Sequence, residues 1–212
     1  MRRRASNEIA LFAGVTCIEL EFLAQGFAEV CGCDEAGRGP LAGPVVAACV
    51  IHRSGNLLES CKDSKILSPA RRDQLYLQIT NEMTYAVGMC DASEIDAVNI
   101  RVASLTAMHR AVMQLTLLNP MILVDGRDRL PGHEHSRAIV DGDDRVSVIS
   151  AASIVAKVTR DRLMQEAHAQ FPQYGFDRHF GYPTAEHRSA IEKFGPCELH
   201  RKTFRGVREF LK

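Results

Sequence analysis

The feature that most constrains the fold is an unbroken run of seven apolar residues, Val-Val-Ala-Ala-Cys-Val-Ile, at positions 45–51. Its length fits one strand, and apolar residues at every position indicate a strand covered on both faces. Further segments of strand type lie at residues 30–34, 84–89, 121–124 and 138–140. A sheet covered on both faces needs helices on each side, so we expect an α/β fold.

Helical patterns lie between these segments. Ser68 and Pro69 form a typical helix start, with Ser as the cap and Pro in the first turn. Leu75, Ile79 and Met83 then follow at four-residue spacing. Further helices are predicted at residues 93–118, 147–169 and 185–194, and residues 7–28 are expected to be partly helical.

We expect the chain to divide into three parts: an N-terminal extension (1–28), a core (29–170) and a small helical, basic, substrate-binding C-terminal segment (171–212). The formal net charge is zero, from 26 Lys and Arg against 26 Asp and Glu. Residues 178–212, however, carry eight basic and four acidic side chains. Overall neutrality therefore does not exclude nucleic acid, whose phosphates are held by local basic groups.

Seven cysteines form no C-x-x-C pair, and the number is odd. This pattern argues against a disulfide framework or a zinc site and favours buried thiols in a reducing cytoplasm. No apolar run reaches the roughly 18 residues that a membrane span requires. We therefore expect a cytoplasmic protein without a membrane partner.

Acidic residues stand where predicted strands end. Asp34 and Glu35 close the first strand, and Asp125 directly follows four apolar residues. Ligands of open α/β sheets bind at these carboxyl ends. For Asp125 the alternative is a simple turn, because Asp-Gly is a common turn pair.

A fourth acid lies on the predicted helix 147–169. Asp161 shares a face with the apolar residues Ala151, Ile154 and Val158, and a charge on a buried face requires a partner or a metal. The alternative is an ion pair with a neighbouring arginine. Four carboxylates without matching His or Cys suit Mg²⁺ or Mn²⁺, and two such ions are typical of phosphodiester cleavage.

The two adjacent acids raise a difficulty. Neighbours on a regular strand point to opposite faces, so Asp34 and Glu35 can share one site only if the strand ends or bulges at Glu35. The glycines that follow permit such a break.

These residues also lie in long motifs that resemble ribonuclease HII, the bacterial type 2 ribonuclease H. The resemblance covers roughly residues 28–205. The matching segments are CDEAGRGPLAGPV (33–45), DSK (63–65), VDG (124–126), ISAASIVAKVTRD (149–161), YGF (174–176), His179, GYPT (181–184), His187 and HR (200–201).

The resemblance implies a ribonuclease H-like fold: a mixed central sheet flanked by helices, with a small helical C-terminal segment. It implies a metal-dependent endonuclease that cleaves the RNA strand of RNA–DNA hybrids and incises 5′ to single ribonucleotides in duplex DNA, leaving 3′-hydroxyl and 5′-phosphate ends. The implied cofactors are two Mg²⁺ or Mn²⁺ ions. The implied ligands are the four acids already named, Asp34, Glu35, Asp125 and Asp161. Nothing in the sequence calls for an oligomer, and we expect a monomer.

The resemblance also implies a set of substrate-binding residues. Gly37, Arg38 and Gly39 match the loop that reads the ribonucleotide, where glycine lets backbone groups approach a 2′-hydroxyl closely. Tyr182 matches a tyrosine that packs on the neighbouring sugar. Three further residues are candidates for contact with the nucleic acid: Lys65, Ser153 and Lys157.

Two positions depart from the family pattern: Asp141 and Phe180 stand where lysine is usual, the former directly before Gly142 and Asp143. Both changes put phosphate contacts in doubt but leave the reaction class unaffected. The alternatives are a two-metal nuclease specific for DNA, a non-catalytic hybrid-binding module, and a small-molecule phosphatase built on residues 141–143. His179, His187 and His200 are expected to serve the structure rather than to contact phosphate.

Overall fold

The computed structural model describes residues 18–52 and 68–211 and contains a five-stranded mixed sheet in the order β3-β2-β1-β4-β5. β1 is antiparallel to β2 and parallel to β4, β2 is antiparallel to β3, and β4 is parallel to β5. The carboxyl ends of β1, β4 and β5 therefore meet at one edge. The strands are β1 (Glu29–Ala36), β2 (Val45–His52), β3 (Thr84–Cys90), β4 (Pro120–Asp125) and β5 (Ser136–Ile139).

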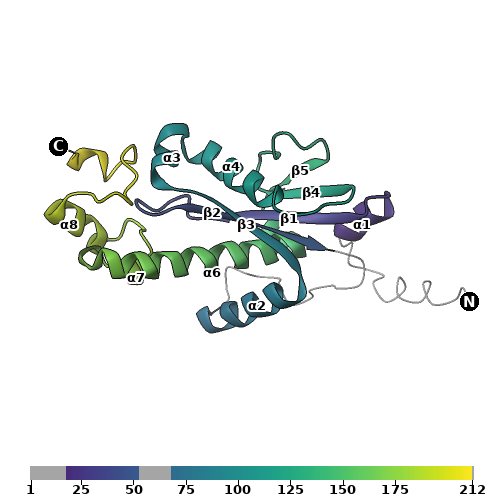
Figure 1. Cartoon of the computed structure of the whole chain (residues 1–212), viewed down its shortest axis with the longest axis horizontal. Coiled ribbons are helices and arrows are strands. Elements are labelled where there is room, and N and C mark those ends of the chain that lie inside the picture. The colour runs from purple at the N-terminus through teal and green to yellow at the C-terminus, as the bar shows by residue number, and fades with distance from the viewer. Residues whose placement is uncertain (1–17, 53–67, 212) are drawn as a thin grey trace, which may run out of the picture.

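Helices cover both faces of this sheet, with α3 and α4 on one side and α2 and the long α6 on the other (Figure 1). The short helices α7 and α8 lie at the opposite end of the molecule from α1. The helices are α1 (Ile18–Ala24), α2 (Pro69–Glu82), α3 (Ala92–Val98), α4 (Ile100–Val112), α5 (Gly142–Arg145), α6 (Ser147–Gln170), α7 (Phe176–His179) and α8 (Ala185–Phe194).

The central strand β2 is buried at every position, as its apolar run predicts. Its odd-numbered residues join the core under α3 and α4, and Ala48 and Val50 join the core under α2 and α6. The predicted mixed α/β architecture is confirmed.

Local signals explain most helix boundaries. The Ser68 hydroxyl accepts a hydrogen bond from the backbone N–H of Arg71, as expected of a cap. The helix predicted over 93–118 is instead two helices, because Asn99 has a φ of 70° and caps α4. The cap of α3 is Asp91, in a capping box with Glu94, two residues before the predicted start of this helix. Of the partly helical segment 7–28, residues up to 17 lie outside the described part.

The expectation that the cysteines are buried free thiols is wrong for one pair, Cys33 and Cys49. Cys33 and Cys49 are register partners on β1 and β2, with Cα atoms 4.3 Å apart, and their sulfurs form a disulfide. The Cys31 sulfur lies within 4.8 Å of both, so three sulfur atoms lie close together. The spacing of these cysteines in the sequence does not match a known metal-binding motif. Strand register, which sequence spacing does not reveal, brings them together. Cys31, Cys90 and Cys197 carry free thiols.

The C-terminal segment is tied closely to the core. A β-bridge joins His200 to Ala42, and the Asp96 carboxylate of α3 accepts from the backbone N–H groups of Lys202 and Thr203. Within the described residues, no helix combines the length and apolarity needed to cross a membrane.

Candidate active site

Three acids meet at the carboxyl edge of the sheet. Asp34 and Glu35 lie on β1, and Asp125 ends β4, the parallel neighbour of β1. Pairing between these strands stops at Cys33 and Val124, just before the acids. The sequence-based grouping of these three carboxylates is therefore realised by the topology.

The strand break expected at Glu35 does not occur. β1 pairs with β2 residue by residue through Ala36, so Asp34 and Glu35 leave opposite faces of a regular strand. Asp34 faces α6 and accepts a hydrogen bond from Ser153, whereas Glu35 accepts one from Arg38 at 2.9 Å. Asp125, at the end of the neighbouring strand, is close enough to act electrostatically on both.

The electrostatics of these acids suit a bound cation. Burial, followed by the charges of Glu35 and Asp125, raises the pKa of Asp34 well above its usual value. Burial also raises the pKa of Glu35, although Arg38 opposes the rise. Divalent cations bound by oxygen ligands relieve such repulsion.

The fourth expected acid, Asp161, lies elsewhere. It pairs with Lys157 one turn before it on α6, with Nζ and Oδ1 2.6 Å apart. Ser153 is the α6 residue that contacts Asp34, and Asp161 is eight residues further on, about 12 Å along the helix axis. The structure does not place Asp161 beside the three acids.

Asp143 is the acid that the sequence reasoning missed. It lies in the first turn of α5, is 4% exposed, and its backbone N–H, like that of Gly142, points at Asp125 Oδ1. In the sequence, Gly142 and Asp143 stand out for the lysine missing before them and as part of the phosphatase alternative at residues 141–143, but not as part of the nuclease metal site. One sequence signal could have identified it: Asp143 follows the predicted strand 138–140 closely, as Asp125 follows the strand 121–124.

Two buried arginines shape the loop of residues 37–39. Arg201 donates to the carbonyl oxygens of Gly37, Arg38 and Gly43, and Arg160 donates to those of Ala42 and Pro44. This assembly leaves no space for a side chain at residue 37, which has a φ of 99°, because a Cβ there would lie 2.1 Å from Arg160 Nε. Neither arginine was expected at the site.

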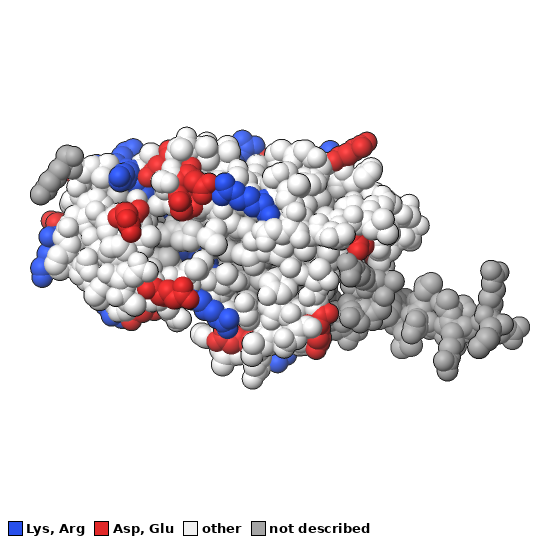
Figure 2. Space-filling model, viewed as in Figure 1, with Lys and Arg blue, Asp and Glu red and all other residues white. Residues whose placement is uncertain are grey.

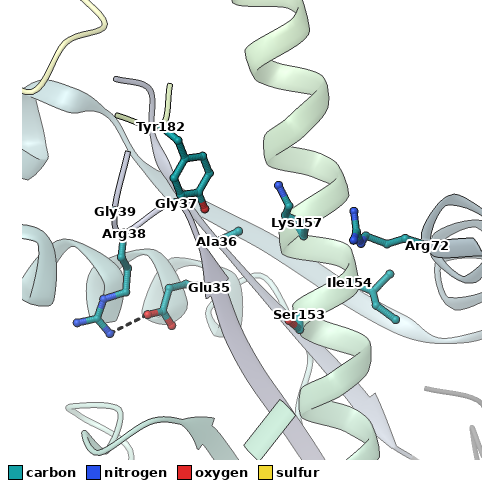
Figure 3. Close-up of a pocket in the computed structure, with 10 residues that line it drawn as sticks. All are labelled: Glu35, Ala36, Gly37, Arg38, Gly39, Arg72, Ser153, Ile154, Lys157 and Tyr182. Carbon is teal, nitrogen blue, oxygen red and sulfur yellow. Dashed lines mark hydrogen bonds and ion pairs between the residues drawn. The ribbon is translucent and has the colours of Figure 1, made fainter. Parts of the chain in front are cut away.

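A pocket of about 420 Å³ opens beside this loop (Figure 3). The Tyr182 ring points over residues 37–39, and Ser153 and Lys157 project from α6. Arg72 of α2, which the sequence did not single out, approaches from the other side. The residues that line the pocket are Glu35, Ala36, Gly37, Arg38, Gly39, Arg72, Ser153, Ile154, Lys157 and Tyr182. Lys65 lies outside the described residues.

Some of the basic side chains of the C-terminal segment contact other parts of the protein and are not free to bind phosphate. Arg201 is fully buried, and Arg178 forms an ion pair with Glu186. On the face in Figure 2, acidic and basic side chains lie side by side rather than in one basic field. The described cations best placed to meet phosphate are those lining the pocket.

Solved structures of similar fold are type 2 and type 3 ribonucleases H. The ribonuclease H2 of Pyrococcus horikoshii OT3 superposes with a TM-score of 0.72 at 27% identity, covering 86% of this chain and 96% of that one. Bst-RNase HIII, solved in complex with Mn²⁺, has a TM-score of 0.66 at 18% identity, covering 88% of this chain and 70% of that one.

Sequence comparisons agree. The family model for ribonuclease HII matches residues 31–207. Ribonuclease HII of Rhizobium leguminosarum bv. trifolii is 50% identical over 193 residues, covering 91% of this chain and 84% of that protein. The enzyme of Rhizobium meliloti is 52% identical over 185 residues, covering 87% and 86%. The chain therefore belongs to the ribonuclease HII family and is a nuclease that acts on RNA–DNA hybrids.

Proposed function

We propose that this enzyme incises duplex DNA 5′ to a single embedded ribonucleotide, in addition to cleaving the RNA strand of hybrids. One observation carries the proposal: the backbone of residues 37–39 lies between the Glu35 carboxylate and the Tyr182 ring. A 2′-hydroxyl both donates and accepts hydrogen bonds, so it is recognised by backbone groups held rigidly at short range. Arg201 restrains this loop by donating to the Gly37 carbonyl, and Arg160 restrains the following segment by donating to the Pro44 carbonyl.

Metal ligands in this proposal are Asp34, Glu35 and Asp125, with Asp143 in place of Asp161 as the fourth. The support is the position of Asp143 beside Asp125 and the pairing of Asp161 with Lys157. Mg²⁺ or Mn²⁺ ions, two in number, would supply activation of the attacking water and stabilisation of the departing 3′-oxygen.

The remaining groups position the substrate. Tyr182, 39% exposed, offers its ring to a sugar, and Arg38, Arg72 and Lys157 offer charge to phosphates along the pocket. Ser153 holds the Asp34 carboxylate in place through its hydroxyl. Cleavage at this site leaves a 3′-hydroxyl and a 5′-phosphate on the ribonucleotide.

The test uses three duplexes of one sequence: all DNA, DNA with one ribonucleotide, and an RNA–DNA hybrid, each with Mg²⁺ and with Mn²⁺. We expect cleavage of the second and third and none of the first. Cleavage of all three would favour a general two-metal nuclease. Binding undiminished by EDTA, with no cleavage in either metal, would favour a hybrid-binding module.

The ligand assignment has a matched pair of variants. Asp143→Asn is expected to abolish cleavage, whereas Asp161→Asn is expected to leave measurable cleavage because its carboxylate pairs with Lys157. The opposite ranking would restore Asp161 to the metal site. Calorimetric titration with Mn²⁺ gives an independent readout, since the fourth ligand's loss weakens metal binding without substrate present.

A further inference from the structure

Three buried histidines lie outside the carboxylate cluster, in the C-terminal segment. His179, His187 and His200 are 7%, 0% and 1% exposed. The rings of His179 and His187 stack at 4.5 Å between centroids, and His187 Nε2 lies 3.1 Å from His200 Nε2. The expectation that these residues serve the structure is consistent with this burial, but their hydrogen bonds have a definite direction.

The direction follows from the backbone groups at each end. The Tyr182 carbonyl, which only accepts, lies 3.0 Å from His187 Nδ1, so His187 carries its proton on Nδ1. The Cys197 N–H, which only donates, lies 2.9 Å from His200 Nδ1, so His200 carries its proton on Nε2. His200 Nε2–H therefore donates to His187 Nε2, and both rings are neutral.

His179 is oriented in the same way. Its Nε2 lies 2.8 Å from the Tyr174 carbonyl and so donates, and its Nδ1 accepts from the backbone N–H of Gly181 at 3.2 Å. The histidines thus hold two successive backbone groups, the N–H of Gly181 and the carbonyl of Tyr182.

This part of the backbone needs external support. Phe180 and Gly181 both have positive φ, 51° and 83°, and a Cβ on Gly181 would lie 2.5 Å from the Ala42 carbonyl oxygen. Leu41 donates to the Gly181 carbonyl at 2.8 Å, which ties the turn to the segment that follows residues 37–39. The direction in which the Tyr182 ring leaves this turn depends on these bonds.

We propose that His187, oriented by His200, is a positioning residue that holds Tyr182 over the substrate pocket. The proposal rests on the substrate-binding role proposed above for Tyr182. His187 itself does not line the pocket and acts only through the Tyr182 carbonyl.

The local environment supports neutral rings. Burial lowers the pKa of His187 and of His200 to about 4. The groups near the pair are His179 of α7, Glu186 and Arg188 on either side of His187 in α8, the Cys197 thiol, and the rings of Tyr174 and Phe176. A second proton would place two N–H groups against each other at the Nε2–Nε2 contact.

Two substitutions at residue 187 separate positioning from packing. The amide nitrogen of His187→Asn takes the place of Nδ1 and keeps the donor to Tyr182. The amide oxygen of His187→Gln takes the place of Nε2 and keeps only the acceptor for His200. Both variants lose ring packing, so a purely structural role predicts the same kinetic effect from each.

We expect His187→Gln to raise KM for the single-ribonucleotide duplex about tenfold with little change in kcat, from the loss of one hydrogen bond to a buried carbonyl. His187→Asn should recover most of this loss. In a Tyr182→Ala background, His187→Gln should have no further effect on KM. The control is His109→Gln on the exposed face of α4, which should leave KM unchanged.

A substrate-free readout keeps the two proposals distinguishable. The backbone 13C′ shift of Tyr182 should move in His187→Gln and stay near the wild-type value in His187→Asn. If Tyr182→Ala leaves KM unchanged, the substrate role of Tyr182 fails, and the 13C′ shift alone decides on positioning. Equal KM or 13C′ effects of the two variants, or an additive effect with Tyr182→Ala, would overturn the inference.

Discussion

Arg201 Nη2 donates to the carbonyl oxygen of Gly37 at 2.6 Å, joining residues 164 positions apart. The guanidinium is buried, and the same group also reaches the Arg38 and Gly43 carbonyls. Burial and the charge of Arg160 lower the pKa of Arg201 to about 9, so it remains a cation at neutral pH. Because the C=O and N–H of a trans peptide point in opposite directions, the N–H groups that follow the Gly37 and Arg38 carbonyls point away from the Arg201 guanidinium.

Arg201→Lys should therefore impair both stability and cleavage. A lysine cannot reach three carbonyls at once, and we expect the free energy of unfolding to fall by about 2–3 kcal/mol. Loosening of the loop should lower kcat/KM by about 10²-fold. Urea unfolding and cleavage of a hybrid measure the two effects, with exposed Arg205→Lys as the control. An Arg201→Lys enzyme with normal kcat/KM would show that loop rigidity is unimportant.

The two loop glycines should respond differently to alanine. Gly37→Ala meets Arg160 at a positive φ, and we expect a loss of about 2–3 kcal/mol in unfolding free energy and little cleavage. At Gly39 a Cβ meets only the edge of the Tyr182 ring at 3.8 Å, so the fold should tolerate alanine. Thermal unfolding tests this, and equal destabilisation by the two changes would contradict the geometry.

Asp34→Asn should raise the free energy of unfolding and lower the rate of cleavage. The pKa of Asp34 is raised, so ionisation of this group costs stability as pH rises from about 3.8 through the raised value. At neutral pH in EDTA, the variant should gain on the order of 1 kcal/mol over the wild type. Cleavage should fall about 10³-fold, because the variant lacks one of the proposed metal ligands. The variant's melting temperature should also respond less to Mg²⁺; near-normal cleavage would contradict the assignment.

Acid should destabilise the C-terminal segment through its histidines. The pKa of His187 and of His200 lies at about 4 in the folded protein, below the ordinary value of 6.5. The unfolded chain therefore binds more protons between these values, and stability falls as pH drops from about 6.5 to 4. Urea unfolding across this range should show a shallower slope for His187→Gln than for the wild type. An unchanged slope would mean that these rings do not govern acid stability.

Much of the fold was predictable because its signals are local. The apolar run of β2, the cap at Ser68 and the helix over residues 185–194 depend on neighbouring residues, and each was confirmed. The helix predicted over 93–118 was wrong because one residue, Asn99, adopts a positive φ that residue spacing does not reveal.

The sequence by itself determined the family, the mixed α/β sheet and the three acids at its carboxyl edge, because strand ends and long motifs are read directly along the chain. Tertiary structure decided which further groups join them. It places Asp143 beside Asp125 and leaves Asp161 with Lys157. It buries Arg201 under the loop and aligns His187 with Tyr182. These contacts join elements whose separation and relative rotation are set by packing, which no spacing along one helix or strand encodes.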